Sequence, residues 1–348
     1  MNEDTNELPK LVDEEALTRF LNEHFQGEAD LVVQRHRAGH SNETFIVLRG
    51  GMQEMVLRRP PLGAFLPSAH DVAREYRVMK ALDQTPVRVP QPLCLSEDES
   101  LIGAPFYLME KVHGVVIRDE LPAAFGEADR RKIGEELVDA LVELHAVDPA
   151  SCGLDTFGKP TGYLERQLRR WTGQLELTLP FTRPLPDLEK VGEWLRDNRP
   201  ESPPTTIVHG DYKLDNVMFA ESPPPRLVAI LDWEMSTLGD PLADVGWMAS
   251  FWLDPEDGTD DLLARQASVT QQPGFLRRAD LVKRYEAATG RDTSALPWYI
   301  VLAIWKLAIL LEGSYARHLA GMTDDPFFAH MEHGVPRLAE RALEVAAG

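Results

Sequence analysis

Two short segments of the sequence, 209–216 and 230–234, carry side chains that can hold a divalent cation and move a proton. The first reads His-Gly-Asp-Tyr-Lys-Leu-Asp-Asn and the second reads Ile-Leu-Asp-Trp-Glu. Each segment follows or contains a run of apolar, β-forming residues, so its polar side chains are expected at the ends of strands. Side chains at such positions are not simply the solvated face of a helix.

Asp211, Asn216 and Asp232 are the three residues of these segments with the clearest chemistry. Pairing of strands 216–219 and 227–231 in a hairpin brings Asn216 and Asp232 together. They then offer two hard oxygen ligands to Mg²⁺, which keeps waters and phosphate oxygens as its other ligands. Asp211 remains free of the metal, as a catalytic base for phosphoryl transfer to a hydroxyl requires. The alternative is that Asp211 and Asn216 are only turn residues.

The elements that must position these residues indicate a two-lobed α+β protein. The first ~110 residues mix strands with helices, whereas most segments after residue 127 have a helical period. A strand-rich lobe followed by helices around a small sheet favours a cleft between lobes. We divide the chain into a nucleotide-binding lobe, 1–111, and a catalytic and acceptor-binding lobe, 112–348. The expected helices are 13–25, 71–82 and 127–148, and the expected strands are 44–49, 54–58, 106–110, 206–209, 216–219 and 227–231.

The composition narrows the possible partners and the compartment. The 348 residues carry a net charge of −20, which argues against nucleic acid as a partner. It does not exclude a small phosphate ligand, because a local cation or metal reverses the field in one site. The polar, acidic start and two cysteines without metal-ligand spacing favour a cytoplasmic protein. The apolar run 296–311 contains Lys306 and is expected to be a core helix, not a membrane span. Nothing indicates the oligomeric state.

The motif H-G-D-x-x-x-x-N at 209–216, followed by D-W-E at 232–234, resembles the aminoglycoside phosphotransferase family. Its members are protein-kinase-like enzymes that phosphorylate small molecules. The resemblance implies ATP as donor, Asp211 as catalytic base, and Asn216 and Asp232 as Mg²⁺ ligands. Asp240 and Asp244 are expected to brace the catalytic loop or to begin a helix.

A kinase-like nucleotide site also needs a cation on the third strand and a helix carboxylate that orients it. Glu75 lies on the apolar side of helix 71–82, where a carboxylate is costly unless it is paired. The basic pair Arg58-Arg59 ends the preceding strand and supplies a partner. Arg58 takes the position where the family often has lysine. Arginine binds phosphate through the paired N–H groups of its planar guanidinium. The alternative is an Arg58–Glu75 ion pair with a structural role alone.

Further nucleotide contacts follow from the resemblance. The turn before strand 44–49 is similar to the family's G-x-S-N form, so Ser41 and Asn42 are predicted to donate hydrogen bonds to phosphate oxygens. Asparagine is also common in turns without a ligand. The strand that runs into Gly114 is similar to the family's hinge, so the Glu110 carbonyl and the Val112 amide are predicted to bind adenine. The alternative is a strand and turn that bind no ligand, which would have the same sequence pattern.

Segments 162–171 and 304–313 resemble one branch of the family, found alone in bacteria and fused to acyl-CoA dehydrogenase domains in animals. That branch is associated with phosphorylation of hydroxylated fatty acids or their CoA esters. The leading hypothesis is therefore an ATP- and Mg²⁺-dependent kinase whose partner is a small-molecule hydroxyl acceptor, a 4-hydroxy acid or hydroxyacyl-CoA. The alternatives are an aminoglycoside or other xenobiotic phosphotransferase and a catalytically silent nucleotide-binding module. Arg166, Arg169 and Arg170 are expected to be a solvated helix face, with acceptor contact as the alternative.

Overall fold

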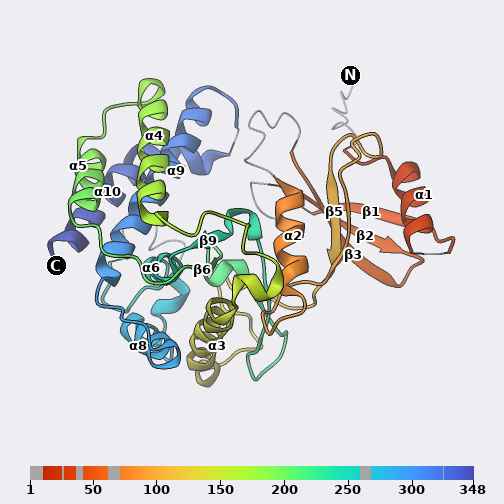
Figure 1. Ribbon diagram of the computed structural model, residues 1–348, viewed down its shortest axis with the longest axis horizontal. Coiled ribbons are helices and arrows are strands. Elements are labelled where there is room, and N and C mark those ends of the chain that lie inside the picture. The colour runs from red at the N-terminus through yellow and green to blue at the C-terminus, as the bar shows by residue number, and fades with distance from the viewer. Residues whose placement is uncertain (1–10, 26, 37–41, 62–70, 259–267, 324) are drawn as a thin grey trace. The chain divides into compact units, whose positions relative to one another are not determined.

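The computed structural model describes residues 11–25, 27–36, 42–61, 71–258, 268–323 and 325–348 (Figure 1). The chain divides into two compact units. Unit 1 comprises residues 1–85, 89–113 and 232–234, and unit 2 comprises 86–88, 114–231 and 235–348. Each unit therefore contains residues that are distant in the sequence, and one of the predicted site residues, Asp232, belongs to unit 1.

The described part of unit 1 contains a five-stranded sheet in the order β1-β2-β3-β5-β4, with every neighbouring pair antiparallel. Its strands are β1 (Leu31–His36), β2 (Glu43–Arg49), β3 (Gln53–Arg59), β4 (Pro92–Ser96) and β5 (Phe106–Glu110). The predicted hairpin is β2–β3, and the predicted strand 106–110 is β5. Strands β1 and β4 were not predicted. Most side chains of β1 are exposed, so no buried alternation marks it, and β4 follows a proline-rich stretch.

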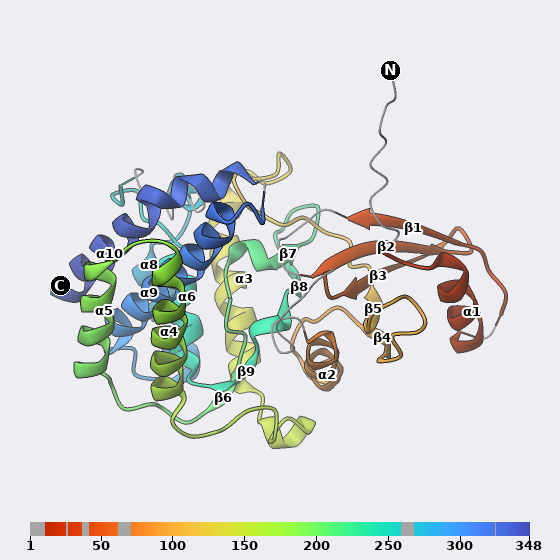
Figure 2. The ribbon, with the colours of Figure 1, turned by 90° about the horizontal axis from the view of Figure 1, so that it is seen from above.

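Two helices pack on this sheet (Figure 2). Helix α1 (Glu14–His24) is capped by Asp13, whose carboxylate accepts a hydrogen bond from the Ala16 amide. Its Leu17 and Leu21 are fully buried in the core formed with the sheet, and such burial is worth about 1.5–3 kcal/mol for each side chain. Helix α2 (Val72–Leu82) contacts β4 and β5 and carries Glu75 on its buried side.

Unit 2 is mostly helical. Helix α9 (Leu296–Leu319) lies at its centre and packs against α4, α5, α6 and α10. By length and composition alone it could cross a membrane, but 67% of its most apolar window is buried inside the fold, as the prediction of a core helix requires. The other helices are α3 (Glu127–Ala146), α4 (Tyr163–Thr178), α5 (Pro186–Asp197), α6 (Pro241–Ser250), α8 (Arg278–Thr289) and α10 (Met331–Ala347).

The short strands of unit 2 form two separate ladders in the described residues, not the single small sheet that the sequence predicts. Strand β7 (Val217–Phe219) pairs with β8 (Leu227–Ile230), which is the predicted hairpin. Strand β6 (Thr206–Val208) pairs instead with β9 (Thr237–Gly239), three residues that carry no recognisable strand pattern. The prediction was wrong here because the partner of β6 is too short to be seen in the sequence.

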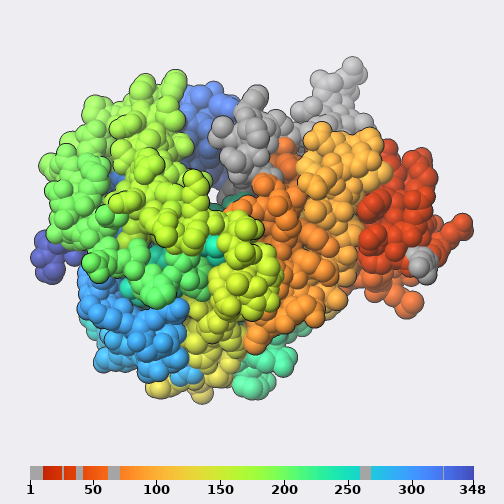
Figure 3. Space-filling model, viewed as in Figure 1, coloured from red at the N-terminus to blue at the C-terminus, as the bar shows by residue number. Residues whose placement is uncertain are grey.

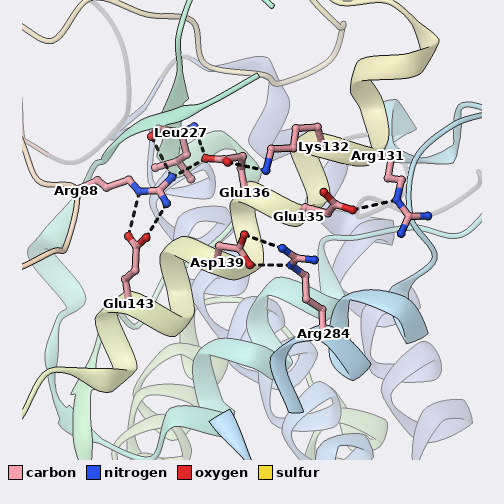
Figure 4. Close-up of polar contacts among 9 residues, drawn as sticks. All are labelled: Arg88, Arg131, Lys132, Glu135, Glu136, Asp139, Glu143, Leu227 and Arg284. Carbon is pink, nitrogen blue, oxygen red and sulfur yellow. Dashed lines mark hydrogen bonds and ion pairs between the residues drawn. The ribbon is translucent and has the colours of Figure 1, made fainter. Parts of the chain in front are cut away.

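A cluster of charged residues ties the segment 86–88 to α3 and β8 (Figure 4). The Arg88 guanidinium donates two hydrogen bonds to Glu143, at 3.0 and 2.7 Å, and one to Glu136 at 2.7 Å. It also donates to the Leu227 carbonyl at 3.1 Å, and the Arg88 carbonyl accepts from the Ile230 amide. Bidentate arginine–carboxylate pairs are among the stronger polar contacts in proteins. Arg88 therefore fixes the strand whose end leads into Asp232.

Candidate active site

The loop after β6 is held by a buried histidine. His209 is fully buried, its Nε2 lies 2.8 Å from the Leu231 carbonyl oxygen, and its Nδ1 accepts from the Asp211 amide at 3.3 Å. These partners assign the proton to Nε2, because a carbonyl can only accept. The ring thus joins the two segments singled out in the sequence. Leu231 also donates its amide to the Asn216 carbonyl at 2.8 Å, at the end of the β7–β8 ladder.

Gly210 allows the sharp turn that presents Asp211. Its φ of +84° lies in the left-handed region that favours glycine, and a Cβ atom at this position would lie 2.6 Å from the Met235 carbonyl oxygen. Its amide donates to Asp244 Oδ1 at 2.7 Å, and its carbonyl accepts from Lys306 Nζ at 2.6 Å. Both sides of this peptide segment are therefore held by charged groups.

Asp244 braces the loop from α6. Its side chain is fully buried and accepts from the His209 amide at 2.6 Å, from the Gly210 amide, and from His145 Nε2 at 3.2 Å. Burial would raise the pKa of Asp244, but the His145 hydrogen bond and the other donors outweigh it and hold the pKa below its ordinary value. The carboxylate therefore stays ionised. Asp240 caps the N-terminus of the same helix, so both expected roles, bracing the loop and beginning a helix, are confirmed.

Asn216 orients Asp211. Its Nδ2 donates to the Asp211 carboxylate Oδ2 at 2.7 Å and to the Asp211 carbonyl at 2.9 Å. The Asp211 side chain is 21% exposed, and Lys213 Nζ lies 4.0 Å from its Oδ1. The Asn216 amide nitrogen is thus committed to Asp211, which leaves Asn216 Oδ1 as the atom able to face a metal. Within unit 2 the structure therefore brings together the predicted base and one predicted metal ligand.

The predicted nucleotide residues of unit 1 form a second cluster around Glu75. Arg58 Nη1 lies 3.6 Å from Glu75 Oε2, and Arg58 Nη2 lies 3.3 Å from Asp232 Oδ1. Glu75 also accepts from the Tyr107 hydroxyl at 2.8 Å and from Asn42 Nδ2 at 2.5 Å. Arg58, and not Arg59, is the partner of Glu75, because Arg59 binds the carbonyls of residues 11 and 102.

The charges in this cluster stabilise one another. Burial lowers the pKa of Arg58, but Tyr107, Glu75, Asp232 and Glu234 around it raise the pKa above its ordinary value. Burial raises the pKa of Glu75, and the field of Arg58 opposes that shift. The Arg58 guanidinium is therefore permanently charged and is held by two carboxylates. Asp232 adopts a φ of +63°, in a region where non-glycine residues are uncommon and aspartate is enriched.

The remaining predicted nucleotide contacts stay predictions. Ser41 lies outside the described residues. Asn42 is buried and gives its amide nitrogen to Glu75, while its Oδ1 has no partner among the described residues. Glu110 is the exposed last residue of β5, and Val112 follows it half-buried.

The three arginines of α4 do not act together. Arg166 donates to the backbone carbonyls of 159 and 161, and the Arg170 guanidinium lies 5.1 Å from the Trp171 ring centre. Arg169 lines an open groove of about 550 Å³ between α4 and α5, two helices visible on the face shown in Figure 3. Three arginines and two glutamates share that groove, so its charges nearly cancel. No residue of segment 209–216 lines it.

Sequence reasoning missed Tyr107 and Lys306 as parts of these clusters. Tyr107 sits in an apolar strand and shows no polar signal. Lys306 does show a polar signal in the sequence, because it is the single charge within the apolar run 296–311. A lone lysine at a core position requires a compensating partner, and here that partner is Gly210.

Comparison with known proteins identifies the family of this chain. The model of the phosphotransferase enzyme family matches residues 32–287. The chain belongs to this family. The phosphotransferase is 36% identical over 341 residues to acyl-CoA dehydrogenase family member 11 of Rattus norvegicus, a match of 95% of this chain but only 43% of the relative. It therefore spans less than half the length of that relative.

Solved structures agree. A putative aminoglycoside phosphotransferase from Ralstonia eutropha is 34% identical, with a TM-score of 0.80 over 96% of this chain and 98% of that one. An aminoglycoside phosphotransferase, APH(4)-Ia, in a complex with ADP and hygromycin B is 16% identical with a TM-score of 0.60 over 96% and 99%, which shows the fold. The predicted α+β kinase-like fold, the family and its acyl-CoA dehydrogenase branch are confirmed. The chain is a member of the phosphotransferase enzyme family and has the fold of small-molecule phosphotransferases.

Proposed function

We propose that this phosphotransferase uses ATP and Mg²⁺ to phosphorylate the hydroxyl group of a 4-hydroxy acid or a hydroxyacyl-CoA. The observation that carries the proposal is the hydrogen bond from Asn216 Nδ2 to Asp211 Oδ2. It holds a partly exposed carboxylate in one orientation and leaves Asp211 Oδ1 to accept the proton of the acceptor hydroxyl. The fixed peptides on either side of Gly210 support that orientation.

Asn216 and Asp232 are proposed as the Mg²⁺ ligands. The described residues contain no group of three or more His, Cys, Asp or Glu side chains that would form a metal site by themselves. This donor set fits Mg²⁺, which is commonly bound through one or two protein oxygens together with phosphate oxygens and waters. The bound cation would neutralise charge on the phosphates.

Arg58 is proposed to bind ATP phosphates. In unit 1 its guanidinium spans Glu75 and Asp232. When Asp232 serves as a metal ligand, Glu75 remains to orient Arg58, and the nitrogens directed at Asp232 become available to phosphate oxygens. Glu110 and Val112 keep their proposed place at the adenine, and Ser41 and Asn42 theirs near the phosphates.

The acceptor class rests on the relatives. Those that match over nearly this whole chain bear the name acyl-CoA dehydrogenase, and more than half of their length lies outside the match. A kinase segment joined to a segment of that name supports a hydroxylated acyl compound as the shared substrate. An antibiotic acceptor is the second candidate, since a hygromycin complex shares the fold. We also propose a cytoplasmic location, which fits the two free cysteines.

The test is a product search with the purified chain, ATP and Mg²⁺. Hydroxy acids, hydroxyacyl-CoAs and aminoglycosides are each incubated and analysed by ³¹P NMR and mass spectrometry. A product heavier by one phosphoryl group in the hydroxyacyl set, absent with Asp211→Asn, supports the proposal. The same product in the aminoglycoside set alone contradicts the acceptor class. Nucleotide binding without any product contradicts turnover and supports the silent module.

A further inference from the structure

Lys306 is a buried cation at the catalytic loop, and the roles proposed above do not use it. The residue lies on the central helix α9 and is 9% exposed. Its Nζ donates to the Gly210 carbonyl at 2.6 Å and lies 4.2 Å from the Trp247 ring centre and 5.7 Å from that of Trp171. Indole faces attract cations, so the ammonium is held between one carbonyl and two aromatic rings.

An ammonium in this setting is costly unless nearby charges compensate it. Among the described residues no carboxylate oxygen lies within 4.0 Å of Lys306 Nζ, so no direct ion pair accounts for it. Asp211 in the loop and Asp244 on α6 favour its charged form, while Arg170 on α4 and Lys213 in the loop oppose it. Burial lowers the pKa of Lys306 to about 8, the largest of these effects. The charge therefore persists at neutral pH.

The position of Lys306 relates it to Asp211 in two ways. Gly210 precedes Asp211, and its amide and carbonyl are bound by Asp244 and Lys306 respectively. The two contacts together fix the backbone from which the Asp211 side chain projects. In addition, the Asp211 charge favours the charged form of Lys306, so the two groups are coupled electrostatically.

We propose that Lys306 is a positioning residue for Asp211: its ammonium holds the Gly210 carbonyl and lies where it is coupled to the charge of the Asp211 carboxylate. This inference rests on the proposed function through the role of Asp211 as proton acceptor. A lysine with a purely structural role would make the same hydrogen bond, but its replacement by glutamine would leave kcat and the pH profile of the folded enzyme unchanged.

Charge coupling can be measured without any acceptor. Lysine side chains labelled with ¹³C and ¹⁵N are titrated by NMR in the whole chain, and the Lys306 signal is assigned by its loss in Lys306→Arg. We expect Lys306 to titrate near pH 8 and to titrate at lower pH in Asp211→Asn, because one of its two favourable charges is gone. The same titration pH in both proteins would overturn the proposal. Because no product is required, this result is independent of whether the proposed acceptor is right.

Activity then separates positioning from packing. Lys306→Gln keeps a donor near Gly210 without the charge, and we expect kcat to fall about tenfold, the change that matches one pKa unit of interaction, with KM for ATP unchanged. The wild-type rate should decline above about pH 8 as Lys306 loses its proton, and the variant should lack this decline. Lys190→Gln, an exposed lysine on α5, serves as the matched control. Wild-type kcat and an unchanged pH profile in Lys306→Gln would overturn the proposal. If Lys306→Gln fails to fold, the NMR titration still decides.

Discussion

Replacing Glu75 with alanine removes an acceptor shared by three side chains of unit 1. Glu75 is 1% exposed and binds the Tyr107 hydroxyl, the Asn42 amide and the Arg58 guanidinium. Loss of its carboxylate leaves the hydroxyl and the amide buried without this partner, at about 1–3 kcal/mol each. Because Arg58 still pairs with Asp232, loss of its contact with Glu75 adds little to this destabilisation. We expect Glu75→Ala to lower the free energy of unfolding of unit 1 by about 2–6 kcal/mol.

Glu75→Gln separates the charge from the hydrogen bonds. The glutamine oxygen can accept from Tyr107 or Asn42, so the loss is expected to be about 1 kcal/mol. Because burial raises the pKa of Glu75, its ionisation weakens the folded state as pH rises above the unfolded value of 4.5. The free energy of unfolding of the wild type should therefore exceed that of Glu75→Gln by more at about pH 5 than at about pH 8.

The assay is urea unfolding followed by circular dichroism, with Glu99→Ala, an exposed glutamate of unit 1, as control. We expect the midpoint of Glu75→Ala to lie well below that of the control. Equal midpoints for the two alanine variants would refute the reasoning, because the buried acceptor would then be dispensable. A Glu75→Gln loss as large as that of Glu75→Ala would refute the separation of charge from hydrogen bonding.

Two further substitutions and one labelling experiment have expected outcomes. Gly210→Ala places a Cβ 2.6 Å from the Met235 carbonyl at a positive φ, so phosphoryl transfer should be lost while the strain lowers the melting temperature; a normal rate in a kinetic assay would contradict this. Arg88→Ala removes four hydrogen bonds and should cost about 2 kcal/mol in urea unfolding, whereas Arg131→Ala, at a side chain that is 70% exposed, should cost under about 0.5 kcal/mol. Burial raises the pKa of Cys94 to about 12, so the native thiol should resist alkylation at neutral pH, and rapid labelling detected by mass spectrometry would show that it is not buried.

The loop and the hairpin were predictable because short-range signals mark them. Apolar runs end directly at His209 and just before Asp232, and the five-residue spacing of Asp211 and Asn216 is local. The structure matches these signals with the Asn216–Asp211 hydrogen bond and the β7–β8 ladder. Glu75 was predictable for a different reason, since a carboxylate on the apolar side of a helix demands a partner.

What the sequence did not reveal depends on contacts between distant segments. Strand β9 is three residues long and is defined only by pairing with β6. Lys306 is 96 positions from Gly210, and nothing local relates the two residues. Arg88 looks like an ordinary loop arginine until α3 and β8 supply its carboxylates and carbonyl. Such partners are set by tertiary packing, which residue periodicity does not encode.

The central claim is that Asp211 accepts the proton of the acceptor hydroxyl. The most direct test compares the rate of product formation for wild type, Asp211→Asn and Asp215→Asn, a nearby half-exposed aspartate paired with Lys213. We expect Asp211→Asn to slow transfer by about 10²–10⁴-fold without changing nucleotide affinity, and Asp215→Asn to transfer phosphate at close to the wild-type rate. Phosphoryl transfer at the wild-type rate in a folded, nucleotide-binding Asp211→Asn protein would contradict the account.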